Sequence, residues 1–180
     1  MNRQVVKTND NSSTLFVPEL AQHYHSTHGA VQESVHVFIE AGLHQFLETQ
    51  QPISILEIGF GTGLNPLLTL LDAEKNNLEI KFTTLEKYPL TMDEAMELNY
   101  GEMLGGRDAK KYLLELHQVV WEKWIEITPK FSILKKEIDF KNFSASAEYD
   151  LIYFDAFAPG AQPNLWTINI FKRMFESLKT

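Results

Sequence analysis

The chain of 180 residues contains no cysteine, no long apolar run and no excess of basic residues. Without cysteine it cannot form a disulfide bond, a thiolate metal site or a cysteine nucleophile. Its first residues lack the apolar core of a secretory signal peptide, and no stretch is long and apolar enough to cross a membrane. We therefore expect a cytoplasmic protein with no membrane association.

The charge balance is acidic. The chain has 16 lysine and arginine residues against 24 aspartate and glutamate residues, which gives a net charge of −8. This balance argues against broad electrostatic binding to nucleic acid. It leaves room for a local basic patch, or for a partner that supplies one.

A cluster of histidines raises the question of a metal site. Three of the six histidines lie between His23 and His28. Their spacing fits no standard helical pair of metal ligands, and no carboxylate lies between them. We therefore expect no metal, and we expect this loop to line a pocket or to cap the core.

The apolar fraction of 44% and the charged fraction of 22% are those of a globular protein, and the length suits a single domain over residues 1–180. Residues 1–50 are expected to form an N-terminal extension, and residues 51–180 a cofactor-binding core. The elements expected in the extension are the hairpin strands Gln4–Thr8 and Ser13–Val17 and the helix Ala30–Glu48.

The segment Ile53–Asn65 reads ISILEIGFGTGLN, which predicts a buried strand, a glycine-rich loop and the start of a helix. A dinucleotide-binding loop needs the spacing G-x-G-x-x-G, but Leu64 and Pro66 stand where its third glycine would be. The pattern E-x-G-x-G-x-G instead resembles the loop of methyltransferases that use S-adenosyl-L-methionine (SAM). A turn that binds no ligand is the alternative. The cofactor-binding residues expected here are Glu57, Gly59, Gly61, Gly63 and Asn65.

The remaining elements of the core alternate between strands and helices, as in an α/β fold with a parallel sheet. We expect a Rossmann-like SAM-dependent methyltransferase fold, in which helices flank this sheet. The expected strands are Leu78–Leu85, Phe131–Leu134 and Tyr149–Phe154, and the expected helices are Leu64–Ala73, Thr91–Leu98, Asp108–Glu126 and a last one that carries the stripe Phe171, Met174, Phe175 and Leu178.

Acidic residues follow three of these strands. Glu86, followed by Lys87, stands where α/β cofactor folds bind ribose hydroxyls, and a carboxylate can accept from two hydroxyls at once. Asp155 is expected to face the reactive end of the cofactor, because its strand and that of the glycine loop should flank the crevice. The methyltransferase resemblance implies that Asp139 binds the adenine amino group, beside Phe140. The alternative for Glu86 is a solvated carboxylate. The alternative for Asp155 is a cap at the end of its strand, and the alternative for Asp139 is a surface acid.

Four stretches together resemble the methyltransferase half of the MnmC-type tRNA-modification enzymes. They are Gln32–Ala41, Leu56–Asn65, Leu85–Leu90 and Asp155–Thr167, the last of which reads DAFAPGAQPNLWT and is the most particular. The resemblance implies methyl transfer from SAM to the exocyclic amine of 5-aminomethyl-2-thiouridine at the tRNA wobble position, with the anticodon stem-loop as partner. It also implies that Asp155 accepts the proton of the amine. The substrate-side residues that we assign are Tyr24, Glu33, Phe38, Phe157 and Pro159.

Apart from its acidic charge, the chain departs from that family in two respects. The flavin-binding oxidase half is absent, so a stand-alone methyltransferase is expected. The last two strands of the usual sheet are also missing, which implies a C-terminally truncated core with an exposed sheet edge. Two alternatives therefore stay open: a SAM methyltransferase acting on another amine or nucleic acid, or a non-catalytic module that binds SAM.

Overall fold

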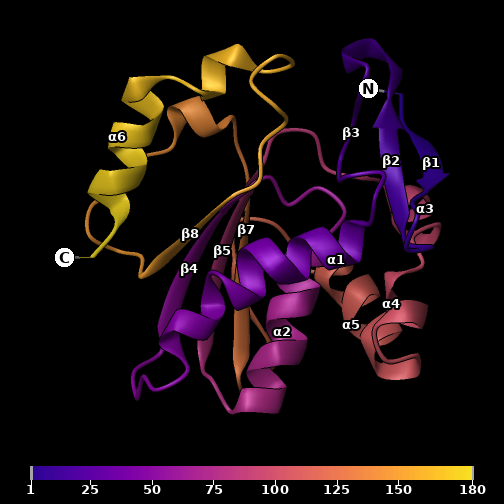
Figure 1. The fold of residues 1–180 in the computed structure, drawn as a ribbon. Coiled ribbons are helices and arrows are strands. Elements are labelled where there is room, and N and C mark those ends of the chain that lie inside the picture. The colour runs from indigo at the N-terminus through magenta and orange to yellow at the C-terminus, as the bar shows by residue number, and fades with distance from the viewer. Residues whose placement is uncertain (1, 180) are drawn as a thin grey trace.

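The computed structural model describes residues 2–179, which form two sheets with helices around the larger one (Figure 1). The smaller sheet is antiparallel and belongs to the N-terminal extension. It confirms the hairpin predicted from the turn residues Asn9–Ser12. Its strands are β1 (Gln4–Lys7), β2 (Ser13–Val17) and β3 (Gln22–His23).

The larger sheet has the strand order β6-β7-β5-β4-β8. Its parallel strands are β4 (Ile53–Ile58), β5 (Ile80–Glu86), β7 (Phe131–Glu137) and β8 (Leu151–Phe154), and β6 (Trp124–Thr128) is antiparallel to β7. Because the chain passes from β4 outward to β5 and β7 and then returns to β8, the strand order reverses between β4 and β8. A crevice at the carboxyl ends of these two strands is where such a sheet binds ligands.

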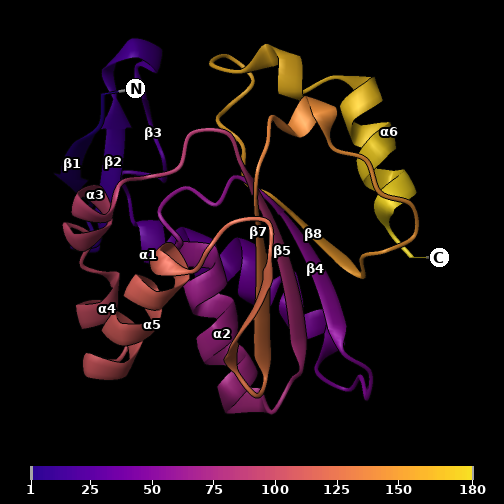
Figure 2. The same cartoon turned by 180° about the vertical axis from the view of Figure 1, so that it is seen from behind.

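Helices cover both faces of this sheet (Figures 1 and 2). One face packs under α2 (Leu64–Asn76) and α5 (Arg107–Gln118) through Ile55, Phe82 and Ile133. The other face packs under α6 (Ile168–Ser177) through Leu56 and Leu85. The alternation of Ile55 and Leu56 between the faces follows from the two-residue period of a strand. The α-helices are α1 (Ala30–Ser34), α2 (Leu64–Asn76), α3 (Met92–Met96), α4 (Tyr100–Met103), α5 (Arg107–Gln118) and α6 (Ile168–Ser177).

Two helix predictions are corrected. The helix expected over Ala30–Glu48 is in three pieces, because α1 passes into a π-helix at Val35–Glu40 and a 3-10 helix at Leu43–Phe46. At Gly42 an added Cβ would lie 2.5 Å from the carbonyl oxygen of Phe38, so the chain turns closely against itself there.

The helix expected over Asp108–Glu126 ends at Gln118, and its last residues belong to β6. Lys135 of β7 is buried, and its Nζ donates to the carbonyl oxygens of Leu116 and His117, both at 2.8 Å. These bonds satisfy carbonyl groups at the end of α5. Ile125, Ile127 and Thr128 are β-branched and then suit a strand beside β7.

The short helix α3 follows β5, as expected, and Thr91 and Glu94 form a reciprocal capping box at its start. Within residues 2–179, β8 forms the edge of the larger sheet opposite β6. Beside it, Leu178 makes an isolated parallel bridge with Tyr149. No helix formed by these residues is both long and apolar enough to cross a membrane.

Candidate functional site

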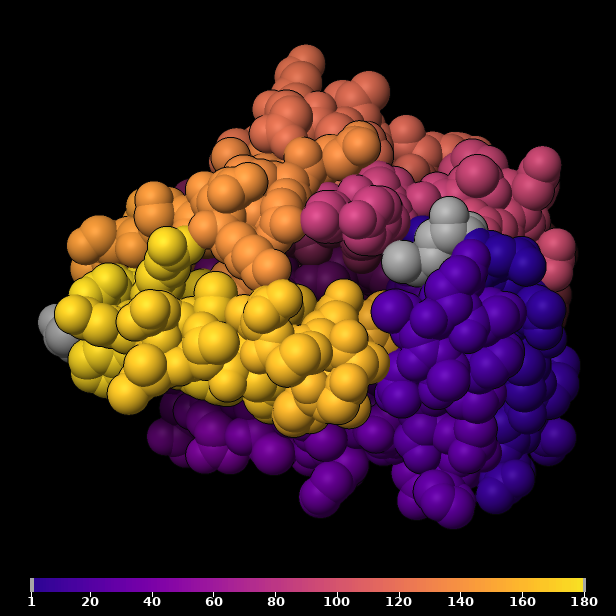
Figure 3. Space-filling view, turned by 90° about the horizontal axis from the view of Figure 1, so that it is seen from above, coloured from indigo at the N-terminus to yellow at the C-terminus, as the bar shows by residue number. Residues whose placement is uncertain are grey.

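A cavity of about 370 Å³ opens at the carboxyl ends of the parallel strands. In Figure 3 a hollow lies between the N-terminal segment, the segment after β5, the segment after β7 and the segment after β8. Its volume lies within the range of small-molecule sites. Its wall combines loop backbone at Gly59 and Gly61 with the carboxyl groups of Glu86, Asp139 and Asp155.

The glycine loop packs too closely for side chains. Gly59 has φ +96°, and an added Cβ would lie 2.6 Å from the carbonyl oxygen of Asp155. Gly61 has φ +49°, and an added Cβ would lie 3.0 Å from the ring of Tyr24. At Gly59 both the conformation and the space therefore exclude other residues, and at Gly61 the positive φ and the tight contact favour glycine.

Two histidines hold Thr62, in the middle of this loop. The Nε2 atom of His25 lies 2.8 Å from Thr62 Oγ1, and Nε2 of His117 lies 3.1 Å from the Thr62 carbonyl oxygen. Burial lowers the pKa of both imidazoles to about 4, so both are neutral near pH 7. His25 comes from the histidine-rich segment and His117 from α5, so the extension and the core clamp the loop together.

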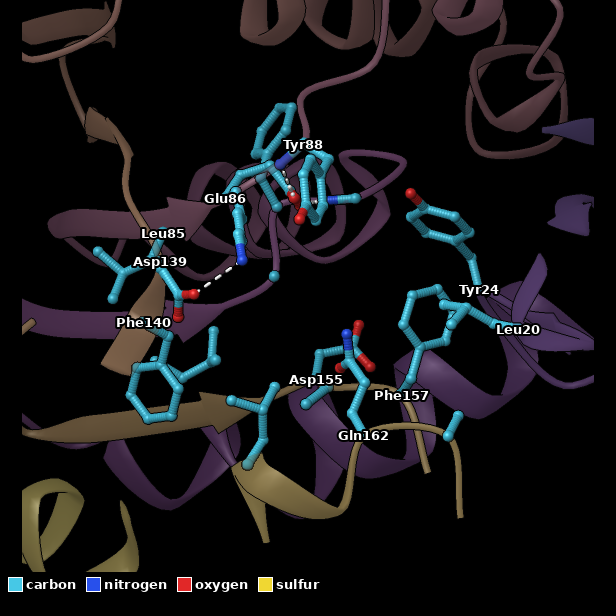
Figure 4. A pocket seen from close by; sticks show the side chains of 18 of the residues that line it. Leu20, Tyr24, Leu85, Glu86, Tyr88, Asp139, Phe140, Asp155, Phe157 and Gln162 are labelled. Carbon is cyan, nitrogen blue, oxygen red and sulfur yellow. Dashed lines mark hydrogen bonds and ion pairs between the residues drawn. The ribbon is translucent and has the colours of Figure 1, made fainter. Parts of the chain in front are cut away.

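Glu86 is fixed at the end of β5 by backbone groups. The Gly61 N–H donates to its Oε2 at 3.0 Å, and the Tyr88 N–H donates to its Oε1 at 2.8 Å. Each carboxylate oxygen can accept a further hydrogen bond, so Glu86 can still receive hydroxyl groups from the cavity (Figure 4).

Asp139 lies across the same end of the cavity. Its Oδ2 is 2.9 Å from Lys87 Nζ, and its Oδ1 accepts from the Lys141 N–H at 3.0 Å. The hydrogen bond from Lys87 holds the pKa of Asp139 below its ordinary value. Ile138 and Phe140 line the cavity on either side of this carboxylate, so a ring bound here would meet apolar atoms beside a hydrogen-bond acceptor.

Asp155 follows β8 and lies in the wall of two cavities. Asn65 Nδ2, from the first turn of α2, donates to its Oδ2 at 2.8 Å. Burial raises the pKa of this carboxyl to about 7, against the hydrogen bond from Asn65, and the charge of Glu33 adds to the rise. A carboxyl with this pKa can take up or release a proton near neutral pH.

The second cavity has a volume of about 480 Å³ and lies between the N-terminal extension and the segment after β8. It shares with the first cavity the residues Tyr24, His25, Asp155, Ala156 and Phe157. The rings of Tyr24 and Phe157 meet edge to face, with their centres 5.1 Å apart. Figure 4 shows both aromatic rings on the side of Asp155 away from Asp139. The other residues of the wall of the second cavity include Glu33, Phe38, His23 and His28.

Three residues expected in the site line neither cavity. Glu57 is fully buried beneath the glycine loop, and its Oε2 accepts from Thr84 Oγ1 at 2.6 Å. Gly63 starts α2, and a Cβ there would lie 2.9 Å from His117. Pro159 is exposed on the segment after β8.

Sequence reasoning missed Arg3, whose side chain is only 5% exposed. Its Nε donates to the Tyr24 hydroxyl at 3.0 Å, and its Nη1 lies 3.1 Å from Glu94 Oε2. Its Nη2 also donates to the carbonyl oxygen of Tyr88. Arg3 thus joins the wall between the two cavities to the loop after β5. A single arginine in a polar N-terminal segment gave no signal in the sequence.

Comparisons with known proteins show similarity to SAM-dependent methyltransferases. Residues 110–180 match the model of a family described as S-adenosyl-L-methionine-dependent methyltransferase. The chain is 28% identical over 170 residues to the tRNA 5-methylaminomethyl-2-thiouridine biosynthesis bifunctional protein MnmC of Leptospira interrogans, covering 87% of this chain and 25% of that protein. It is 27% identical over 179 residues to the same protein of Paraburkholderia xenovorans, covering 91% of this chain and 26% of that protein.

A solved structure gives the same relationship. The crystal structure of MNMC2 from Aquifex aeolicus superposes with a TM-score of 0.81 at 26% identity, covering 99% of this chain and 57% of that one. The chain thus spans about a quarter of the bifunctional relatives and somewhat more than half of the solved one. The likeness covers the N-terminal extension together with the core.

Proposed function

We propose that this chain, a SAM-dependent methyltransferase domain of the MnmC family, methylates the exocyclic amine of 5-aminomethyl-2-thiouridine at the wobble position of tRNA. The observation that carries the proposal is the position of Asp155. Its carboxyl lies in the wall shared by a cavity built on the glycine loop and a cavity built on the extension. We assign the first cavity to SAM and the second to the substrate base.

The residues of the first cavity fit SAM. Gly59 and Gly61 keep the loop free of Cβ atoms, Glu86 offers acceptors for ribose hydroxyls, and Asp139 offers an acceptor for the adenine amino group. The carboxyl groups of this wall suit a cofactor that carries a sulfonium and an ammonium group, since opposite charges attract strongly in a partly buried site. When bound, SAM supplies an electrophilic methyl group on its positively charged sulfur.

The residues around the second cavity can orient a base and its amine. Phe157 and Phe38 offer ring faces or edges on which an unstacked base can lie, as proteins commonly bind single-stranded RNA bases. Tyr24 is held by Arg3 at its hydroxyl, so its ring is fixed in the wall. Most of the rate enhancement would come from this orientation of the amine.

Asp155 is the group that we assign to the proton. Its Oδ2 is engaged by Asn65, which leaves Oδ1 to accept the proton that the amine releases on methylation. With a pKa raised to about 7, this carboxyl is a stronger base than an ordinary aspartate and is still largely ionised slightly above neutral pH. Activity should accordingly rise as the pH increases through about 7.

The test is to incubate the purified chain with SAM and with tRNA that carries the terminal aminomethyl group, and to analyse the nucleosides by mass spectrometry. We expect 5-methylaminomethyl-2-thiouridine to form. A parallel arm supplies the free nucleoside, because the net charge of −8 favours a small amine as the alternative substrate. Methylation of the nucleoside but not of the tRNA would reject the tRNA assignment. Heat of SAM binding with no methylation of either would reject the catalytic proposal and leave a SAM-binding module.

A further inference from the structure

Two buried polar atoms beneath the glycine loop lack a hydrogen-bond partner among residues 2–179. They are Oε1 of Glu57 and Oδ1 of Asn65. Asn65 also lies close enough to Glu57 to act on the pKa of that carboxyl, and as a hydrogen-bond donor its amide would lower this pKa. Unpaired polar atoms at such depth are rare, because each one lowers the stability of the folded state. Two of them on interacting side chains indicate a hydrogen bond whose proton has not been assigned.

The neighbouring contacts define a chain of four side chains. At one end Thr84 Oγ1 donates to Glu57 Oε2 at 2.6 Å, and at the other end Asn65 Nδ2 donates to Asp155 Oδ2 at 2.8 Å. Between them an ionised Glu57 would present only an acceptor to the amide oxygen of Asn65. Two acceptors repel, whereas a proton on Glu57 would satisfy both atoms at once.

We propose that Glu57 is a neutral carboxylic acid whose Oε1–H donates to Asn65 Oδ1, and that it serves as a positioning residue for Asp155. The donated hydrogen bond fixes which end of the Asn65 amide points toward Asp155. With the oxygen engaged by Glu57, the NH₂ group faces Asp155 and stabilises its ionised form. If the amide turned over, its oxygen would face Asp155 and repel that form. The mechanistic meaning rests on the function proposed above, but the protonation of Glu57 does not.

The surroundings place the proton on Glu57 rather than on Asp155. Glu57 has no exposed surface, and burial raises its pKa well above the ordinary value. The charges of Asp155 and Glu86 add to the rise, against the hydrogen bonds of Thr84 and Asn65, which lower the pKa. Asp155 lines both cavities and receives the Asn65 hydrogen bond, although the charge of Glu33 opposes its ionisation. The other titratable groups nearby are the hydroxyls of Tyr153, which interacts with Glu57, and Tyr100, which interacts with Asp155.

The variants Glu57→Gln and Glu57→Ala test the positioning role. The glutamine amide can donate an N–H to Asn65 and accept from Thr84 without carrying charge, whereas alanine does neither. We expect E57A to lose at least tenfold in methyl-transfer rate and to shift the midpoint of the pH profile upward, because Asn65 is then free to turn. E57Q should regain most of the loss, with a midpoint close to that of the wild type. An E57Q variant as slow as E57A, or one with the shifted midpoint, would overturn the inference, since an ionised carboxylate would then be needed.

Infrared spectroscopy tests the protonation without any activity. The difference spectrum of wild type minus E57Q should contain the carbonyl-stretching band of a protonated carboxyl that persists from pH 7 to pH 8.5. If the variants do not fold, the band is followed in the wild type after ¹³C labelling of its glutamates, which shifts a glutamic acid band and leaves an aspartic acid band in place. Absence of the band, or a band that the label does not shift, would refute a neutral Glu57. A persistent, shifted band in a protein that methylates no tRNA would leave the inference standing and reject only the substrate.

Discussion

The raised pKa of Asp155 predicts that this residue lowers the stability of the fold at the pH where its proposed role as a base requires the ionised form. Its pKa is about 7 in the folded protein, against an ordinary value of 3.8. The folded state therefore holds a proton that the unfolded state has released, and stability falls as the pH rises from about 4 to about 7. The free energy of unfolding falls by about 4 kcal/mol in total as Asp155 ionises, and by about 1.4 kcal/mol between pH 6 and pH 8.5. Because Asp155 is partly exposed at the cavity wall, water should reduce the latter figure to about 1 kcal/mol.

The variant Asp155→Asn isolates this contribution. Asparagine cannot ionise, yet its amide oxygen can still accept the hydrogen bond from Asn65. Urea unfolding of both proteins at pH 6 and at pH 8.5 gives a double difference in which all other titrating groups cancel. Between pH 6 and pH 8.5, we expect the free energy of unfolding of D155N to rise by about 1 kcal/mol relative to that of the wild type. The same variant should lose at least about 100-fold in methyl transfer while its affinity for SAM changes less than about tenfold.

A stability difference that does not vary with pH would show that Asp155 has an ordinary pKa in the folded protein. The assignment of Asp155 as a base near neutral pH would then fail as well. A methyl-transfer rate in D155N equal to that of the wild type would remove the residue from the mechanism whatever its pKa. The two measurements thus test the electrostatic argument and the catalytic argument separately.

Two further substitutions test the wall of the site. Gly59→Ala should weaken SAM binding and destabilise the fold by about 1–3 kcal/mol, because φ is positive and the new Cβ meets the Asp155 carbonyl oxygen. The control is Gly160→Ala, since a Cβ at Gly160 meets nothing within 4 Å. Equal calorimetric affinities of the two variants for SAM would contradict the prediction. Arg3→Lys should raise the KM for SAM and lower the free energy of unfolding in urea by about 2–3 kcal/mol, because lysine cannot reproduce the forked contacts of Arg3. The control is Arg107→Lys, at an exposed arginine, and an identical result for it would refute the specific role of Arg3.

The parts of the fold that sequence reasoning predicted are those set by local patterns. The strand before Gly59 and the helix after Gly63 follow from an apolar run, a set of glycines and a helix start within a few residues. The clustering of Glu86, Asp139 and Asp155 follows from the geometry of parallel strands, whose carboxyl ends share one edge of the sheet. The ligand roles assigned to these acids stay predictions.

The parts that could not be predicted depend on contacts between distant residues. The helix α5 stops at Gln118 because Lys135, from a strand 17 residues further along, binds its last carbonyl groups. Periodicity alone continues the helix into Trp124–Thr128, because Ile125 and the tryptophans also fit a helical stripe. Arg3 acts on the backbone of Tyr88 and Pro89, and no local pattern connects residues that far apart.

The N-terminal extension forms part of the candidate site and is not merely an addition to the core. The sheet alone provides the glycine loop, Glu86, Asp139 and Asp155, which form one wall of the first cavity. The second cavity exists only where the extension meets the segment after β8. His25 holds Thr62, and Arg3 holds both Tyr24 and the loop after β5, so the extension also fixes parts of the first cavity, which we assign to SAM. The solved relative superposes over 99% of this chain, so the likeness includes both the extension and the core. In the function proposed above, the cofactor and the amine would meet at the boundary between them.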